Sequence, residues 1–238
     1  MTEPTSSRAD TRSRIVAAAA RLLQEEGPAA VTTRRVADAA GVQAPTLYRL
    51  FGDKDGLLEA VAEHVLAGFV AAKAAVVAAA AATDVHPLDD LRAGWELQID
   101  FGLTNPALFR LLSDPDRALH SPALRSGRRV LERRVRRVAL TGRLRVSEQR
   151  AVGLLQAAGT GVLQTLLSTP PEDRDPDLAD AMYEAVLTQV LTDAPERVDD
   201  RPTATAVAFR AVVPRLTMLS AAERQLLADW LDRSIDAL

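Results

Sequence analysis

The sequence predicts an all-α protein in which a small N-terminal unit of three helices is followed by a larger C-terminal helical bundle. Apolar residues recur over most of the chain at the i, i+3, i+4 and i+7 spacing of amphipathic helices. No stretch shows the sustained alternation of period two that indicates a strand. Of the 238 residues, 47% are hydrophobic but only 4% are aromatic, and this Ala- and Leu-rich composition favours helices over sheets.

The N-terminal unit is predicted from its helix start and stop signals. The apolar face of its first helix carries Ile15, Ala18, Ala19, Leu22 and Leu23, and Gly27-Pro28 ends that helix. The hydroxyl of Thr32 can cap a short second helix that ends at Gly41. A third short helix spans 45–51, with Pro45 tolerated in its first turn. Gly52 interrupts the chain, and Asp53 can cap a fourth helix over 54–82.

The same signals predict the remaining helices. They are expected over 87–103, 106–112, 121–145, 147–168 and 176–191. The acidic, Pro-containing stretch 193–202 is expected to be a linker, followed by helices over 203–213 and from about 220 onward. The piece after Pro202 looks like an addition to the bundle, and its role stays open.

Composition excludes several classes of function. The chain has no Cys, which excludes a disulfide framework, a zinc–thiolate site and a Cys nucleophile. Its three His are scattered, and no phosphate loop or paired carboxylates stand out, so we expect no metal, no cofactor and no enzyme. The polar start is not expected to be a signal peptide. The Ala-rich run 65–82 is read as a soluble helix because it is short and contains Lys73, so we expect no membrane partner and a cytoplasmic protein.

The segment Thr32 to Phe51, TTRRVADAAGVQAPTLYRLF, has the pattern of a helix-turn-helix, whose second helix enters the major groove of DNA. Its small and apolar residues Val36, Ala37, Ala40, Val42, Leu47 and Phe51 form an inner core, and Gly41 allows the positive φ of a sharp exit. The side chains expected to point outward are those of Arg34, Gln43, Ala44, Thr46, Tyr48 and Arg49. Arg can pair with guanine, Thr and Ala can contact a thymine methyl, and Tyr48 and Lys54 can contact phosphates.

At these residues the sequence resembles the tetracycline-repressor (TetR) family of bacterial transcription regulators. The motifs are V-T-T-R-R-V-A-D-A-A-G-V and P-T-L-Y-R-L-F-G-D-K-D-G-L-L, within a match from Ile15 to about Val61. The resemblance implies a homodimeric all-α repressor that binds a palindromic double-stranded DNA operator and is released by a small-molecule effector. By position, it implies DNA contacts at Thr33, Arg34, Ala44, Pro45, Thr46, Tyr48, Arg49 and Lys54. Gln43 and Leu50 depart from the family pattern, which weakens the helix cap and removes one contact.

The larger half carries no motif of comparable specificity. A ligand pocket is expected where apolar walls mix with few polar groups. The candidate lining residues are Trp95, Gln98, Phe101, Phe109, Gln156, Thr160, Gln164, Met182 and Tyr183. Taken singly, the aromatic residues are equally well explained as core, and Gln164 as surface.

Charges and small residues in the same half suggest further contacts. Ten Arg lie between 121 and 150 and ten acids between 171 and 200. These are read as solvated faces, with mutual docking or an entry for an anionic ligand as alternatives. The helices over 147–168 and 176–191 are the candidates for a dimer interface, and an intrachain core is the competing explanation.

The leading interpretation is a ligand-responsive transcriptional repressor. The expected organisation is a flexible arm over 1–10, a helix-turn-helix DNA-binding domain over 11–58 and a ligand-binding and dimerisation domain over 59–238. The alternatives are a ligand-independent DNA-binding regulator and, less favoured, an α-helical enzyme.

Overall fold

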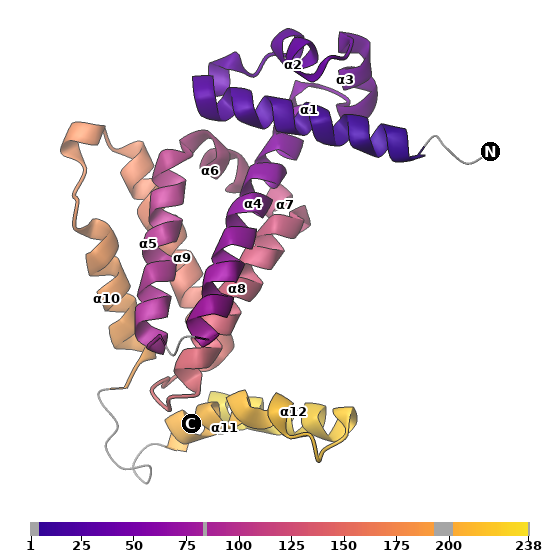
Figure 1. The fold of residues 1–238 in the computed structure, drawn as a ribbon. Helices are drawn as coiled ribbons and strands as arrows, with labels where there is room; N and C mark the ends of the chain where they lie inside the picture. The colour runs from indigo at the N-terminus through magenta and orange to yellow at the C-terminus, as the bar shows by residue number, and fades with distance from the viewer. Residues whose placement is uncertain (1–4, 83–84, 193–201, 238) are drawn as a thin grey trace. The chain divides into compact units, whose positions relative to one another are not determined.

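The computed structural model describes residues 5–82, 85–192 and 202–237, and all regular elements within these ranges are helices, as predicted (Figure 1). The chain divides into two compact units. The first comprises residues 1–72 and 105–127, and the second residues 73–104 and 128–238.

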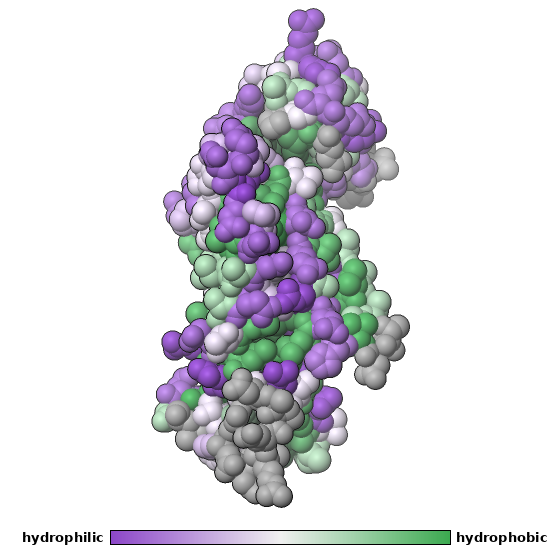
Figure 2. Space-filling model, turned by 90° about the vertical axis from the view of Figure 1, so that its left-hand side faces the viewer, coloured by the Kyte–Doolittle hydropathy of each residue, from purple (hydrophilic) through white to green (hydrophobic). Residues whose placement is uncertain are grey.

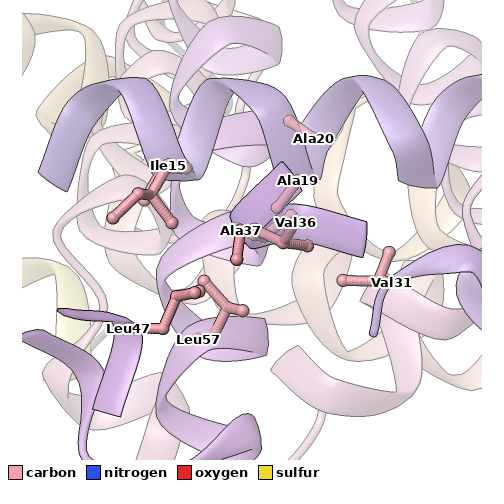
Figure 3. Close-up of a cluster of buried hydrophobic side chains, with 10 residues drawn as sticks. Ile15, Ala19, Ala20, Val31, Val36, Ala37, Leu47 and Leu57 are labelled. Carbon is pink, nitrogen blue, oxygen red and sulfur yellow. The ribbon is translucent and has the colours of Figure 1, made fainter. Parts of the chain in front are cut away.

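The first unit contains a small helical core around helix α1 (Thr5–Glu26). A 3-10 turn (Pro28–Ala30) leads to α2 (Thr33–Ala40) and α3 (Ala44–Phe51), and α4 (Lys54–Ala82) follows. Each of the four α-helices contributes to one cluster of buried side chains: Ile15, Val16, Ala19, Ala20, Val31, Val36, Ala37, Leu47, Leu57 and Val61 (Figure 3). Three residues predicted for the inner core of the helix-turn-helix, Ala40, Val42 and Phe51, are partly buried against this cluster.

The expected N-terminal arm over 1–10 is wrong for its second half. Helix α1 already begins at Thr5, and Arg8, Ala9 and Asp10 in its first turns are exposed. Residues 1–4 of the arm lie outside the described residues.

Short helices complete the first unit. Helix α6 (Pro106–Leu112) was predicted, whereas α7 (Pro115–His120) was not. The Asp114 carboxylate accepts hydrogen bonds from the backbone N–H groups of Asp116 and Arg117, which is the capping that starts α7. Glu63 of α4 accepts hydrogen bonds from the hydroxyl of Ser121 (2.6 Å) and the N–H of Ala123 (2.5 Å), so a carboxylate occupies the start of α8.

The second unit is built on long helices. Helices α5 (Pro87–Thr104), α8 (Pro122–Ala139), α9 (Glu148–Ser168) and α10 (Leu178–Val190) form a bundle in which α9 packs against both α5 and α10. The start of α8 belongs to the first unit. A 3-10 turn (Pro171–Asp173) connects α9 to α10. Gly102 of α5 is buried against α9. A Cβ at this position would approach Leu163 Cδ2 to 2.5 Å, so a side chain does not fit there.

The predicted extent of one helix, 121–145, is wrong. Helix α8 ends at Ala139, and Gly142 takes a left-handed φ of 72° that turns the chain. The backbone N–H of Arg145 then donates to the carbonyl of Val190 (2.9 Å), and the N–H of Thr192 donates to the carbonyl of Arg143 (2.8 Å). Backbone pairing with the end of α10 therefore replaces the last predicted turns of the helix.

The C-terminal segment forms a helical hairpin. Helix α11 (Pro202–Val212) continues through a 3-10 turn (Val213–Arg215) and packs on α12 (Ala221–Ala237). Arg210 and Asp232 join the two helices with an ion pair of 2.8 Å. Most of the predicted linker 193–202 lies outside the described residues.

Two helical segments, Lys54–Ala80 and Glu148–Ser168, are long and apolar enough to cross a bilayer by length and composition alone. Core helices of soluble proteins meet the same criterion. The surface seen in Figure 2 mixes hydrophobic and hydrophilic patches.

Candidate nucleic-acid interface

Helices α2 and α3 are positioned by the capping chemistry of a short stretch of chain. The Thr32 hydroxyl accepts a hydrogen bond from the N–H of Arg35 at 3.3 Å, as predicted. Gly41 takes a φ of 66° and its N–H donates to the carbonyl of Asp38 at 3.2 Å, which closes α2. Val42 leaves the turn with a hydrogen bond from its N–H to the carbonyl of Ala37 at 3.0 Å. Gln43 makes no side-chain cap, as expected from its departure from the family pattern.

Burial of one face of α3 turns the opposite face outward. Leu47 is buried in the cluster of the first unit, and Leu50 packs partly against that cluster. Among the predicted contact residues, those that are exposed are Arg34, Gln43, Ala44, Pro45, Tyr48, Arg49 and Lys54. Thr33 and Thr46 are half-buried. Tyr48 keeps 53% of its surface exposed, so its phenol lies on the outer face.

A close approach of backbone to backbone joins α3 to α4. Gly52 takes a φ of 81° and its N–H donates to the carbonyl of Tyr48 at 2.9 Å. Asp53 Oδ1 accepts a hydrogen bond of 2.8 Å from the N–H of Gly56, which caps α4 as predicted. A Cβ at Gly56 would collide with the carbonyl oxygen of Phe51. The sequence reasoning missed this requirement, although a Gly inside the first turn of a helix, where it has no capping role, is a usable signal.

Some basic side chains of the first unit make contacts within the protein and others remain exposed to solvent. Arg35 Nη2 lies 2.6 Å from a carboxylate oxygen of Glu26, so this guanidinium ties α2 to the end of α1. The guanidinium of Arg12 lies 5.1 Å from the centre of the Phe51 ring, a cation–π contact that covers the base of the core. Arg34, Arg49 and Lys54 are the exposed cations that remain on and beside α2 and α3.

The predicted pocket residues are only partly brought together. Trp95, Gln98 and Gln156 line one small cavity of about 20 Å³ in the second unit. Tyr183 is buried beside it, with its ring centre 5.4 Å from that of Trp95. Phe101 is half-buried on α5. Sequence reasoning missed Lys73 and Arg134, which line the same cavity.

Four residues predicted for the pocket lie elsewhere. Thr160, Gln164 and Met182 are exposed at the surface, because α9 and α10 bury their other faces between the helices. Phe109 lies on α6 in the first unit.

The arginine-rich helix is less solvated than expected. Arg134 is only 2% exposed, and its Nε lies 3.1 Å from Asp90 Oδ1, while Arg137 Nη1 lies 2.7 Å from Asp90 Oδ2. The acids Asp180 and Glu184 pair with Arg92 of α5. Arg134 and Arg137 of α8 and Asp180 and Glu184 of α10 thus pair with residues of α5, and the proposed docking of the basic helix on the acidic stretch is not the arrangement of these pairs.

Two short helices around a three-residue turn, with a buried joint and an exposed second helix, define a helix-turn-helix unit. Residues 15–61 match the family described as bacterial regulatory proteins of the tetR family. The HTH-type transcriptional regulator BetI of Burkholderia pseudomallei is 34% identical over 125 residues, which cover 52% of this chain and 63% of that protein. The class A tetracycline repressor from transposon 1721 of Escherichia coli is 47% identical over 53 residues, or 22% of this chain and 24% of that protein. Residues 15–61 are therefore similar to the DNA-binding segment of tetR-family regulators, and the chain spans less than two thirds of the length of these relatives.

Solved structures show the same fold. A TetR transcription regulator from Haloarcula marismortui superposes with a TM-score of 0.51 at 20% identity, over 77% of this chain and all of that one. The superantigen PfiT gives a TM-score of 0.51 at 20% identity, over 81% of this chain and all of that one. These likenesses concern the arrangement of helices alone.

Proposed function

We propose that this protein is a sequence-specific DNA-binding transcriptional regulator, and that it acts as a repressor. The observation that carries the proposal is the outer face of α3, where Tyr48 and Arg49 are exposed while Leu47 anchors the helix in the core. A buried anchor fixes the orientation of the helix, so Arg49 reaches the base edges of a major groove while Tyr48 reaches the phosphates beside it. The match of residues 15–61 to the tetR-family model supports the same function.

Each exposed residue has a chemical role in this proposal. Arg34 and Arg49 donate two hydrogen bonds each to the O6 and N7 of guanine, and Ala44 and Thr46 contact thymine methyl groups. The Tyr48 hydroxyl and the Lys54 ammonium bind phosphates, and with Thr33, Gln43 and Pro45 they set the register on the backbone. Lys54 begins α4, whose free N–H groups favour an anion, although the Asp53 carboxylate already occupies the N–H of Gly56.

The protein is further proposed to work as a cytoplasmic homodimer on a palindromic operator, without catalytic activity. A two-fold dimer places two copies of α3 in major grooves about one helical turn apart or somewhat more. The candidate interface is on α9 and α10, where small residues are exposed: Gly153, Ala157, Gly161, Ala181 and Ala185. On the same two helices Leu155, Val162, Val186 and Val190 are buried within the subunit. A small-molecule effector is proposed to release the protein from its operator. It does so by binding the conformation of the dimer with low affinity for DNA more tightly than the DNA-binding conformation.

The decisive experiment is footprinting on the DNA upstream of its own gene, followed by gel-shift titration of variants. Arg49→Ala is expected to weaken specific binding by about 1–3 kcal/mol and to leave non-specific binding nearly unchanged. Lys54→Ala is expected to weaken binding to all DNA sequences alike. It should also reduce the slope of log affinity against log salt concentration by about one released counterion. Arg21→Ala, which removes an exposed Arg from the outer side of α1, is the matched control and should bind as wild type. Wild-type binding by both interface variants would refute the contact scheme.

A further inference from the structure

Basic side chains of the second unit lie near one buried carboxylate, that of Asp90. Arg134 is 2% exposed, Lys73 is half-buried, and the guanidinium of Arg137 reaches the same carboxylate as Arg134. Asp90 supplies one negative charge, and both of its oxygens are engaged, by Arg134 Nε at 3.1 Å and by Arg137 Nη1 at 2.7 Å. The two guanidiniums of Arg134 and Arg137 therefore share one carboxylate in a region where uncompensated charge is costly.

Two buried donors at this place have no acceptor. Arg134 Nη2 and Trp95 Nε1 are inaccessible to solvent and have no hydrogen-bond partner in the part of the chain that the structure describes. Both residues line the cavity of about 20 Å³, and Trp95 is only 7% exposed. An N–H group buried without an acceptor costs about 1–3 kcal/mol, so native proteins rarely keep two side by side.

The remaining polar residues of the cavity supply donors as well. Lys73 contributes an ammonium group and Gln98 an amide. The carbonyl oxygen of the Gln156 side chain already accepts a hydrogen bond from Arg128 Nη1 at 2.6 Å. Leu91, Leu131 and Leu155 form the apolar walls. The lining is rich in donors and carries net positive charge.

Gly94 adapts the backbone to this arrangement. It is buried on α5 and lines the cavity, and a Cβ at this position would collide with the guanidinium of Arg134. The guanidinium therefore lies directly against the α5 backbone, where only Gly leaves room for it.

We propose that this cavity is a binding site for a small monovalent anionic group, either a halide ion or the carboxylate head of an organic acid, held by Arg134, Trp95 and Lys73. A volume of about 20 Å³ has room for one body of about the size of a water molecule, so a small ion or the end of a carboxylate enters and little more. Desolvation by burial, together with the neighbouring Arg134, lowers the pKa of Lys73 to about 8, and a bound anion relieves this penalty. Binding itself does not depend on DNA. Any effect on operator affinity rests on the proposed function.

The test measures anion binding by the protein alone. The thermal midpoint is followed by far-ultraviolet circular dichroism while chloride or acetate replaces a bulky sulfonate buffer anion at constant ionic strength. The chlorine NMR linewidth reports chloride exchange directly. Both should show saturable binding by wild type. In Lys73→Met and Trp95→Phe the apparent affinity should fall by about tenfold or more, as for the loss of a hydrogen bond to a charged group. Arg133→Met, which removes an exposed Arg next to Arg134 on α8, should bind as wild type.

The outcomes separate the possible occupants. Saturation by chloride with no response to carboxylates assigns a halide site, and tighter binding of carboxylates assigns the head group of an organic effector. A thermal midpoint that does not change when the anion is exchanged, with no broadening of the chlorine line, would show that no anion occupies the cavity and would overturn the proposal. Equal binding by wild type and Lys73→Met would overturn it as well. Gel-shift titration with the saturating anion then tests regulation separately, so failure of DNA binding leaves the anion result intact.

Discussion

Asp90 is the residue on which the polar interior of the bundle depends. Its carboxylate is buried on α5 and pairs with both Arg134 and Arg137, one oxygen to each. Neither the spacing of Arg on α8 nor the position of Asp90 predicted this pairing, because the expected amphipathic pattern places Arg outward. Burial of Arg134 is a tertiary effect, made possible by the missing side chain of Gly94.

Removal of the Asp90 charge is expected to be strongly destabilising. Asp90→Asn leaves the buried Arg134 without a counter-ion, and breaking such a pair costs about 3–5 kcal/mol of unfolding free energy. Asp180→Asn is the control, because Asp180 is exposed and lies 3.8 Å from Arg92, where surface pairs contribute about 0–1 kcal/mol. Urea denaturation followed by circular dichroism measures both changes. Equal losses would contradict the assignment of Asp90 as the buried counter-ion.

Lys73 should make stability depend on pH in a defined window. Burial lowers its pKa to about 8 in the folded chain, against 10.5 for the ordinary group, and Arg134 adds to the shift. Between these two values the unfolded chain keeps a proton that the folded chain has lost, so the unfolding free energy contributed by Lys73 rises with pH. Below pH 8 both states are protonated and the penalty is fully present.

The measurement is the difference in unfolding free energy between wild type and Lys73→Met across this window, in a buffer without halide or carboxylate. The difference should shift in favour of wild type as pH rises. A difference that stays constant with pH would show that Lys73 is not held in a desolvated state.

At the scale of elements, helices α2 and α3 were predictable because their boundaries are set by local chemistry. Thr32 caps, Gly41 takes a positive φ and Pro45 lies in the first turn of α3, and each effect involves neighbours in sequence. The end of α8 was not predictable, because Arg143 and Arg145 exchange backbone hydrogen bonds with the distant end of α10. The pocket was predicted only in part for the same reason. Amphipathic spacing identified Trp95 as inward, but it could not tell which face of α9 or α10 would be covered.

The junction between α3 and α4 should tolerate no side chain at position 56. In Gly56→Ala the new Cβ meets the carbonyl oxygen of Phe51, which is backbone and cannot move aside cheaply. We expect the unfolding free energy to fall by about 2 kcal/mol or more. DNA binding should also weaken, since α3 would move relative to the core in which Leu47 is buried. Gly68→Ala on the same helix has open space around the new Cβ and should be neutral or slightly stabilising. Thermal denaturation of the two variants gives the comparison, and equal midpoints would contradict the close approach.

At the scale of the whole molecule, the all-α class and the order of most helices followed from the spacing of apolar residues and from the residues that start and stop helices. The division into a DNA-binding domain ending at 58 and a second domain from 59 stays a prediction, as does the dimer. The helical hairpin α11–α12 was expected only as extra helices after Pro202. Among the parts described, Phe209, Met218 and Trp230 lie on or beside this hairpin and are exposed. Nothing in the sequence predicted these exposed apolar side chains.

The proposed dimer can be tested at α9. Ala157 and Gly161 are exposed one turn apart, and a large charged side chain there would separate two closely packed helices. Ala157→Arg is therefore expected to convert a dimer into a monomer in sedimentation velocity at micromolar concentration. Ala222→Arg, on the exposed side of α12, should sediment as wild type. A wild-type monomer, or a dimer that survives Ala157→Arg, would remove α9 from the interface.

The double pairing at Asp90 also has a mechanical consequence. Arg134 and Arg137 stand three residues apart on α8, and both reach one carboxylate on α5. Sliding either helix along the other by a single turn, about 5.4 Å, would break both pairs at once. These two ion pairs fix the register of α5 and α8, and the two helices should move together as one rigid body. Any rearrangement of the bundle in response to a ligand has to be taken up by the helices that lack such a clamp.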